Sequence, residues 1–215
     1  MRPGQQAPQA GSIDPAGSGA VAAFGRRIAA TSELAERAGA IAAAAHAMAV
    51  RFHQGGKLVA FGTGPASTDA QHVAVEFVHP VIVGKRALPA ICLTCDVATI
   101  TAVAAETGLA EIFAHQVDRL ALPADIAIGI SADGNCPAVL GGLRAARARG
   151  MLTVALVGGD GGAIAATGVA DHLLAGASGD PRIVKEIHVT TYHVLWELVH
   201  VFFEQPGVLG PGIVA

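Results

Sequence analysis

Short apolar runs alternate with helical patterns along residues 57–204. The runs are rich in valine, isoleucine, leucine and alanine and are bounded by glycine, proline or charge, which is typical of strands buried on both faces. This alternation predicts a three-layer, doubly wound α/β domain with a parallel five-stranded sheet. The predicted strands cover residues 57–62, 88–95, 125–131, 152–157 and 171–174. The predicted helices cover residues 67–78, 97–122, 137–149 and 181–204, with a short helix after 158–162.

An alanine-rich helical pattern precedes the first predicted strand, from about residue 20 to residue 54. Ser32 is the predicted N-cap, with Glu33 and Glu36 in the first turn after it. Gly55 and Gly56 end the helical pattern. The chain is therefore expected to divide into a disordered tail at 1–16, an N-terminal helical segment at 17–56, the α/β domain at 57–207 and a C-terminal tail at 208–215.

Composition narrows the functional classes. Hydrophobic residues make up 52% of the chain and charged residues 14%, yet no apolar run is long enough to span a bilayer. We therefore expect the apolar excess in the sheet and in helix faces that contact other subunits. A net charge of −3 without a basic stripe argues against a nucleic-acid partner. The absence of a charged-then-apolar leader after Met1 favours the cytoplasm over secretion.

The three cysteines do not suggest a disulfide framework. Cys92 and Cys95 form a C-x-x-C pair, a spacing used in metal and redox sites. Both lie in the predicted strand 88–95, where positions three apart point to opposite faces. We therefore expect two small buried residues, reduced as in the cytosol.

Two loops follow predicted strands and open helices. The first includes Gly62, Thr63, Gly64, Ser67 and Thr68, and the second covers residues 131–136. Turns of this kind present free N–H groups and the positive end of a helix dipole. Two of them in one parallel sheet predict a crevice at the carboxyl ends of the strands for a small anionic or polyhydroxylated ligand.

Two helices carry candidate chemical groups. His72 and Glu76 are four residues apart, so they share a helix face that can hold a metal or place a base beside a ligand. From spacing alone, the favoured interpretation is that His72 and Glu76 are an ordinary exposed pair on a helix. The last predicted helix carries a polar stripe on an apolar background, which requires a site, a subunit contact or water. The stripe consists of Glu186, His193, Glu197 and His200.

Together these features resemble the SIS (sugar isomerase) domain family, and within it the phosphoheptose isomerase subfamily. The resemblance covers about residues 30–204 in order and implies a flavodoxin-like fold with N-terminal helices. The matching segments are GTGPA at 62–66, DAQHVAVE at 69–76, CD at 95–96, SADGNC at 131–136, LVGGDGG at 156–162 and KEIHVTTYH at 185–193.

The resemblance implies an activity and an assembly. A Glu and a His of the family's motifs interconvert ketose and aldose through an enediol, and they correspond here to Glu76 and His193. The family assembles as a tetramer through its terminal helices, so a homotetramer, or at least a dimer, is expected.

The resemblance also implies a metal set, of which this chain keeps three members. Several relatives bind zinc through four positions that are His72, Glu76, Lys185 and His193 in this chain. A lysine must deprotonate to ligate a metal, so we expect its ammonium near Glu76 or His72 and no cofactor. Zinc held by the other three side chains and water is the alternative.

The second loop departs from the family pattern of phosphate-binding hydroxyls. Ser131 is kept, but Ala66, Ala132, Asp133 and Cys136 stand where the family has hydroxyl residues. An ionised Asp133 at a helix N-terminus is expected to take the place of a phosphate and repel one. The ligand-binding candidates are Gly62, Thr63, Gly64, Ser67, Thr68, Asp96, Ser131, Asp133, Gly134, Asn135, Cys136 and Lys185.

Two functions remain open from sequence. The first is a phosphoheptose-isomerase-like aldose–ketose isomerase acting on a sugar or sugar phosphate, which the retained Glu76 and His193 favour. The second is a non-catalytic SIS protein that binds a sugar derivative or a protein partner, which the lost hydroxyls and Lys185 favour.

Overall fold

A computed structural model describes residues 17–205 and 207–210. The tail predicted at 1–16 and most of the tail predicted at 208–215 lie outside these residues. Within residues 17–205 and 207–210, no helix combines the length and the apolar character needed to cross a membrane.

The core of the fold is a five-stranded parallel sheet in the order β2-β1-β3-β4-β5. All residues of β1, β3 and β4 are buried, as the continuous apolar runs predict. The strands are β1 (Leu58–Gly62), β2 (Ala90–Cys92), β3 (Ile126–Ser131), β4 (Leu152–Gly158) and β5 (His172–Gly176). The predicted parallel α/β class is therefore confirmed.

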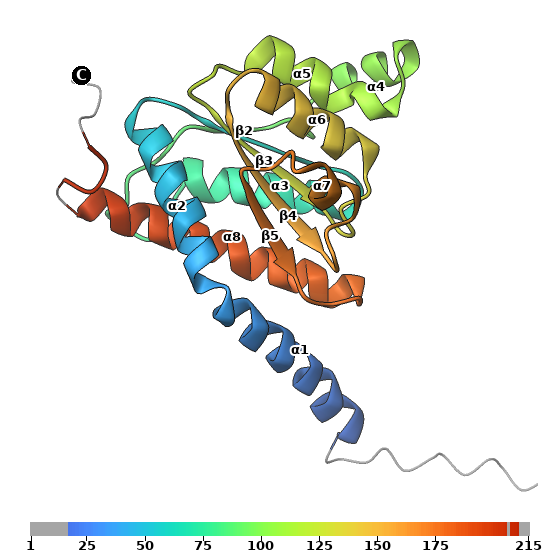
Figure 1. The fold of residues 1–215 in the computed structure, drawn as a ribbon, viewed down its shortest axis with the longest axis vertical. Coiled ribbons are helices and arrows are strands. Elements are labelled where there is room, and N and C mark those ends of the chain that lie inside the picture. Colours follow the sequence, from blue (N-terminus) through green and yellow to red (C-terminus); the bar gives the residue numbers. More distant parts are fainter. Residues whose placement is uncertain (1–16, 206, 211–215) are drawn as a thin grey trace, which may run out of the picture.

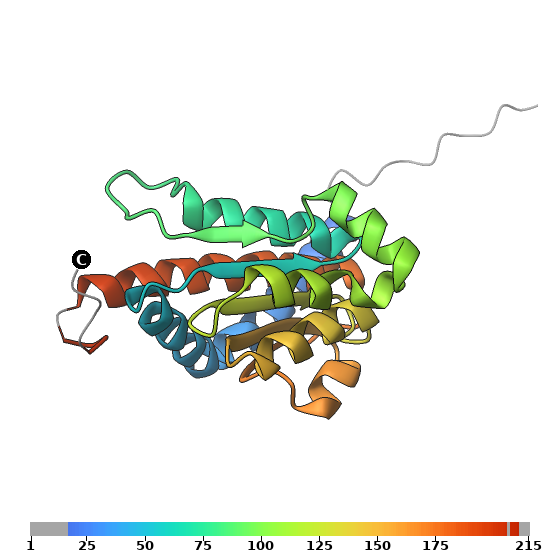
Figure 2. The same cartoon turned by 90° about the horizontal axis from the view of Figure 1, so that it is seen from above.

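Helices cover both faces of the sheet (Figures 1 and 2). One apolar cluster joins the sheet to α2, α3 and α8, and a second joins the opposite face to α4, α5, α6 and α7. The helices are α1 (Ser18–Glu36), α2 (Ala38–His53), α3 (Pro65–Val78), α4 (Val97–Glu106), the 3₁₀ turn η1 (Leu109–Glu111), α5 (Ile112–Leu120), α6 (Pro137–Ala148), α7 (Gly162–Thr167) and α8 (Pro181–Glu204).

The N-terminal helical segment differs in detail from its prediction. It forms two helices that meet at Arg37, and Ser32 lies inside the first of them rather than at an N-cap. Helix α1 begins at Ser18, so the alanine-rich sequence before Ser32 propagates the helix through it. High helix propensity over several turns outweighs one favourable capping residue.

The predicted strand 88–95 is also shorter in the structure. Strand β2 ends at Cys92, and the chain turns at residues 93–94. Cys95 is exposed in that bend, and both cysteines line one pocket beside α4 and α5. The expectation that they are buried and point to opposite faces is therefore wrong, because it assumed an extended backbone.

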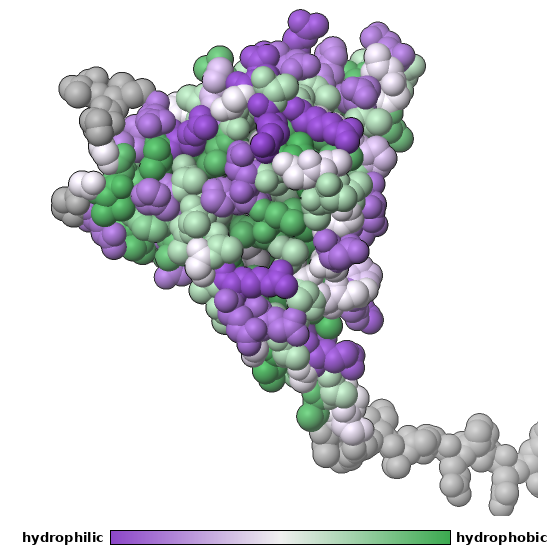
Figure 3. All heavy atoms as spheres, in the orientation of Figure 1, coloured by the Kyte–Doolittle hydropathy of each residue, from purple (hydrophilic) through white to green (hydrophobic). Residues whose placement is uncertain are grey.

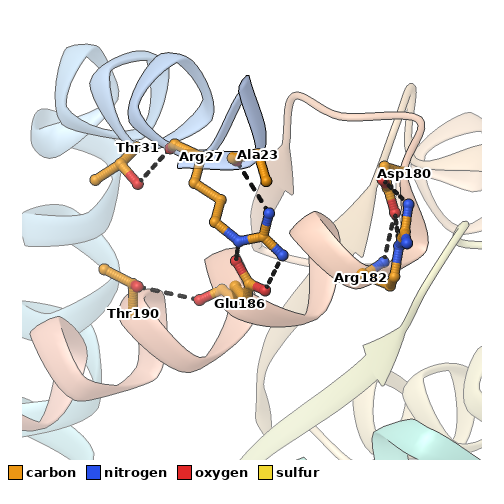
Figure 4. Close-up of polar contacts among 7 residues, drawn as sticks. All are labelled: Ala23, Arg27, Thr31, Asp180, Arg182, Glu186 and Thr190. Carbon is orange, nitrogen blue, oxygen red and sulfur yellow. Dashed lines mark hydrogen bonds and ion pairs between the residues drawn. The ribbon is translucent and has the colours of Figure 1, made fainter. Parts of the chain in front are cut away.

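Helix α1 projects from the body of the molecule and rests mainly on α8 (Figure 1). Arg27 holds it there with two contacts to Glu186, at 2.7 and 2.8 Å (Figure 4). Val21, Phe24 and Ile28 are each at least 66% exposed along this helix. Hydrophobic spheres, in green, are visible among hydrophilic ones, in purple, on the projecting arm in Figure 3.

Asp180 is the N-cap of helix α8, and its side chain accepts a hydrogen bond from the backbone N–H of Arg182. The Arg182 side chain also pairs with this carboxylate (Figure 4). These contacts with Arg182 lower the pKa of Asp180 to about 2. Pro181 follows at the first helical position, where its missing N–H costs nothing.

The loops after β3 and β4 are packed backbone to backbone at Gly134. This residue has φ +71°, and a Cβ there would lie 1.9 Å from the carbonyl oxygen of Gly161. Its own carbonyl accepts a hydrogen bond from Ile164 at 3.0 Å. Glycine is therefore required both by the backbone conformation and by the space available.

We predict that Gly134→Ala destabilises the protein far more than Gly159→Ala. Gly159 also has a positive φ of +59°, but a Cβ there meets nothing within 4 Å. The Gly159 variant should therefore show only backbone strain, of about 1 kcal/mol, while the Gly134 variant adds a steric clash with backbone. Urea unfolding of both variants measures the difference. Equal losses of unfolding free energy would contradict the packing argument.

Candidate active site

Two pockets lie next to each other along α3 and α8. The first, which we call the two-loop pocket, has a volume of about 210 Å³ and lies between the loops after β1 and β3 and the first turns of α8. The hydroxyl of Thr63 and the thiol of Cys136, 3.1 Å apart, connect these loops. Gly62 ends β1, where a Cβ would meet the carbonyl oxygen of Ala66 at 2.8 Å.

The second pocket, which we call the His–Glu pocket, contains the predicted isomerase pair. His72 and Glu76 reach it from α3, and His193 reaches it from α8. The Oε1 atom of Glu76 lies 3.1 Å from Nε2 of His72 and 4.0 Å from Nε2 of His193. The expectation that Glu76 and His193 project into one cleft is therefore confirmed within a single chain.

Neighbouring residues of α8 fix this arrangement. The Tyr192 hydroxyl lies 2.7 Å from Nδ1 of His72, so Nε2 of that ring faces Glu76. Burial, followed by the charges of Asp69 and Glu76, raises the pKa of Tyr192, which therefore stays a neutral phenol. The Trp196 indole N–H donates to the main-chain carbonyl of Glu76 at 2.8 Å. Both contacts position residues of α3 from α8.

The His–Glu pocket also has the donor set of a metal site. One ligand atom from each of His72, Glu76 and His193 lies within 4.8 Å of the other two. Two histidines and a carboxylate, with one open position for water, match a catalytic Zn²⁺ site. The contact of His72 with Tyr192 provides the orienting partner that such ligands use.

Lys185 is not part of this cluster. Its ammonium contacts Asp69 at 2.6 Å, the carbonyl oxygen of Pro65 at 2.9 Å and the hydroxyl of Thr68 at 3.1 Å. The expectation that it would lie near Glu76 or His72 is therefore wrong. Asp69 is 4% exposed, and this buried carboxylate draws the lysine towards the two-loop pocket.

Asp133 lies in the loop that opens α6. Its carboxylate accepts hydrogen bonds from the backbone N–H of Asn135 at 2.9 Å and from the Ser131 hydroxyl at 3.4 Å. The Asn135 N–H is the main cause that lowers the pKa of Asp133. This group is therefore ionised at neutral pH, at the edge of the two-loop pocket.

Comparison with known proteins agrees with this geometry. The SIS domain family model matches residues 23–158, well over half of the chain. The chain belongs to the SIS domain family.

Individual relatives narrow the similarity. The chain is 42% identical over 170 residues to a phosphoheptose isomerase from Solidesulfovibrio magneticus, covering 79% of this chain and 82% of that one. It is also similar to two solved phosphoheptose isomerase structures. The one from Francisella tularensis has a TM-score of 0.79 and 34% identity over 84% of this chain and 95% of that one. The one from Neisseria gonorrhoeae has a TM-score of 0.77 and 31% identity over 84% and 96%.

The SIS domain places several predicted binding residues away from both pockets. Asp96 caps α4, accepting the backbone N–H of Thr99 at 3.1 Å, and lines the pocket of the two cysteines. Asn135 contacts the backbone N–H of Ala163 on the neighbouring loop at 3.0 Å. The hydroxyl of Ser67 donates to the carbonyl of Gly64 in its own turn at 2.7 Å.

The polar stripe of α8 serves three separate purposes. Glu186 pairs with α1, and His193 and Glu197 line the His–Glu pocket. His200 is buried, with Nε2 3.0 Å from the carbonyl of Arg86 and Nδ1 2.8 Å from the carbonyl of Trp196. The stripe therefore does not form one site.

Four residues of the SIS domain were not predicted as site residues: Asp69, His188, Tyr192 and Trp196. The first two were visible as motif positions, but their spacing does not show that they line the two-loop pocket. The last two follow His188 at four-residue spacing on α8, which places all three on one helix face. That periodicity was the available signal.

We predict that Zn²⁺ raises the thermal unfolding midpoint of the SIS domain, because an ion bound by the native state stabilises it. His72→Ala should remove most of this shift. His79→Ala is the matched control, since His79 lies at the end of the same helix and outside the cluster. Equal shifts in both variants, measured by differential scanning fluorimetry, would show that the ion binds elsewhere.

Proposed function

We propose that this SIS domain is an aldose–ketose isomerase of the phosphoheptose isomerase kind, acting on a sugar through an enediol. The observation that carries the proposal is the convergence of Glu76 and His193 on one pocket. The relatives named phosphoheptose isomerase support it further, at about 40% identity over most of the chain.

The chemistry requires one proton moved between carbons and one between oxygens. In the proposed reaction, the Glu76 carboxylate removes the proton from the carbon next to the carbonyl, which gives the enediol. His193 transfers a proton between the two neighbouring oxygens. Glu76 then returns its proton to the other carbon. The carbonyl and the hydroxyl have then exchanged places on the two carbons, with no external oxidant or reductant.

The protein environment suits these roles. The Glu76 side chain is 11% exposed, whereas that of His193 is 45% exposed. The carboxylate is therefore held in a fixed place, while the imidazole is open to a substrate. The buried Tyr192 hydroxyl and Trp196 indole keep α3 in register with α8 and so hold the pair at its distance.

A metal ion is an addition to this scheme rather than a requirement. His72, Glu76 and His193 would hold Zn²⁺, and the ion would polarise the sugar carbonyl as a Lewis acid. Lys185 takes no part in that set, because its ammonium is committed to Asp69 and the loop after β1.

The non-catalytic alternative is weaker. It rested on the lost hydroxyls and on Lys185 near the metal position. With Lys185 elsewhere, the isomerase pair is unobstructed. The relatives above 39% identity are named as isomerases rather than as binding proteins.

We further propose a homotetramer, or at least a dimer, located in the cytoplasm. Exposed Val21, Phe24 and Ile28 line one side of the projecting α1, where a monomer leaves them in water. The three free thiols are consistent with a reducing compartment.

We predict that Glu76→Gln lowers isomerase turnover by about 100-fold or more, the scale of a lost general base. The thermal midpoint should change little, because the amide has nearly the same size and stays beside His72. Glu197→Gln is the matched control, since it removes a carboxylate from the same pocket without touching the pair. Exchange of the substrate carbon-bound proton with deuterated solvent, followed by NMR, measures the reaction. Full exchange in the Glu76 variant would exclude this residue as the base.

We also predict that a Phe24→Asp, Ile28→Asp double variant forms smaller assemblies than the natural chain. Charges on the exposed face of α1 cannot be buried at a subunit contact without a large desolvation cost. Leu109→Asp is the control, because Leu109 is exposed on η1 on the other side of the sheet. Light scattering at micromolar protein gives the masses. A natural chain that is already monomeric would contradict the assembly proposal.

A further inference from the structure

The two-loop pocket carries an anion of its own. Asp133 lines it, and its lowered pKa keeps the carboxylate ionised. The buried Asp69 carboxylate also lines it, but that charge is balanced by Lys185 at 2.6 Å. The pocket therefore keeps one net negative charge when these side chains are counted.

The only lysine or arginine among the described residues that line this pocket has no donor left. The ammonium of Lys185 has three N–H groups, and it contacts three protein oxygens, of Pro65, Thr68 and Asp69. A phosphate bound here would have to break one of these contacts. Arg182, the next cation along α8, is paired with Asp180 outside the pocket.

Two backbone N–H groups of the second loop that could bind an anion are also occupied. The backbone N–H of Gly134 donates to the Ser131 hydroxyl at 3.1 Å, and that of Asn135 donates to the Asp133 carboxylate at 2.9 Å. The Ser131 hydroxyl itself donates to Asp133. The carboxylate of Asp133 thus fills the place among these donors that an external anion would need.

The two-loop pocket also contains a buried polar atom without a hydrogen-bond partner among residues 17–205 and 207–210, Nε2 of His188. His188 is 3% exposed. Burial is the main cause that lowers the pKa of His188, so the ring is neutral at pH 7. The main-chain carbonyl of Val157 accepts a hydrogen bond from this ring, and Nε2 is not the atom involved. Nε2 of the neutral ring is therefore the acceptor, which takes a hydrogen bond from a hydroxyl or water and not from an anion.

We propose that the two-loop pocket binds the uncharged, hydroxyl-bearing end of a sugar and rejects a phosphate monoester there. The inference rests on the proposed isomerase function and specifies its substrate class. Asp69 in this pocket and His72 in the His–Glu pocket are three residues apart on α3, which is about 4.5 Å along the helix. A sugar with its reacting carbons at Glu76 therefore extends its far end towards Asp133 and His188.

The test measures the binding of three probes by calorimetry: sedoheptulose, sedoheptulose 7-phosphate and inorganic phosphate. The natural chain should bind sedoheptulose at least as tightly as its 7-phosphate and should not bind inorganic phosphate. An Ala132→Thr, Asp133→Ser variant and an Asp133→Asn variant should each gain about tenfold or more in affinity for the 7-phosphate. This gain should shrink at high salt, as expected for a removed repulsion.

Asp160→Asn is the matched control. Asp160 accepts a hydrogen bond from the backbone N–H of the residue two positions later, as Asp133 does. Both aspartates line a neighbouring cavity, but only Asp133 also lines the two-loop pocket. The Asp160 variant should change the affinity for the 7-phosphate by less than about twofold. An equal gain in the Asp160 and Asp133 variants would overturn the inference, because the effect would then come from net charge alone.

Two further outcomes separate this inference from the proposed function. If the natural chain binds the 7-phosphate more than tenfold tighter than sedoheptulose and isomerises it, the inference fails and the isomerase stands. If sedoheptulose binds but its carbon-bound proton never exchanges with solvent, the substrate class stands and the isomerase fails. Absence of binding by all three probes to every variant would also overturn the inference.

Discussion

The site depends on the way α3 lies along α8. Three polar contacts follow one another in the same order on both helices: Asp69 with Lys185, His72 with Tyr192, and the carbonyl of Glu76 with Trp196. The two helices therefore run in the same direction where they meet. The carbonyl of Glu76 belongs to the last turn of α3, where helical carbonyls lack an intrahelical partner. The Trp196 indole N–H donates a buried hydrogen bond to this carbonyl. Apolar packing and hydrogen bonding therefore favour the same alignment of α3 along α8.

The parts of the fold that could be predicted are those with a signal in the local sequence. Buried parallel strands give continuous apolar runs, and Pro181 after Asp180 marks the start of α8 at the residue where it begins. The failures occurred where one local signal was weaker than its surroundings. Ser32 is a good capping residue inside a good helix, and residues 93–95 continue an apolar strand pattern while the backbone turns.

The candidate site was predictable in its reacting pair but not in its surroundings. The motif positions led to Glu76 and His193, and the structure places them in one pocket. The position of Lys185 could not be read from its place in a motif, because a long flexible side chain goes to whichever buried charge it can reach. Asp69 is that charge, and its burial is a property of the assembled helices.

Helix α8 connects features that lie far apart in the molecule. With 24 residues, it runs from the two-loop pocket through the His–Glu pocket towards the C-terminus. Glu186, which holds α1, directly follows Lys185 on this helix. The first turns of α8 therefore carry both the anchor of α1 and part of the two-loop pocket, which this helix lines with Pro181, Val184, Lys185 and His188. A substitution on α1 that shifted this anchor would therefore act next to the two-loop pocket without changing a residue that lines it.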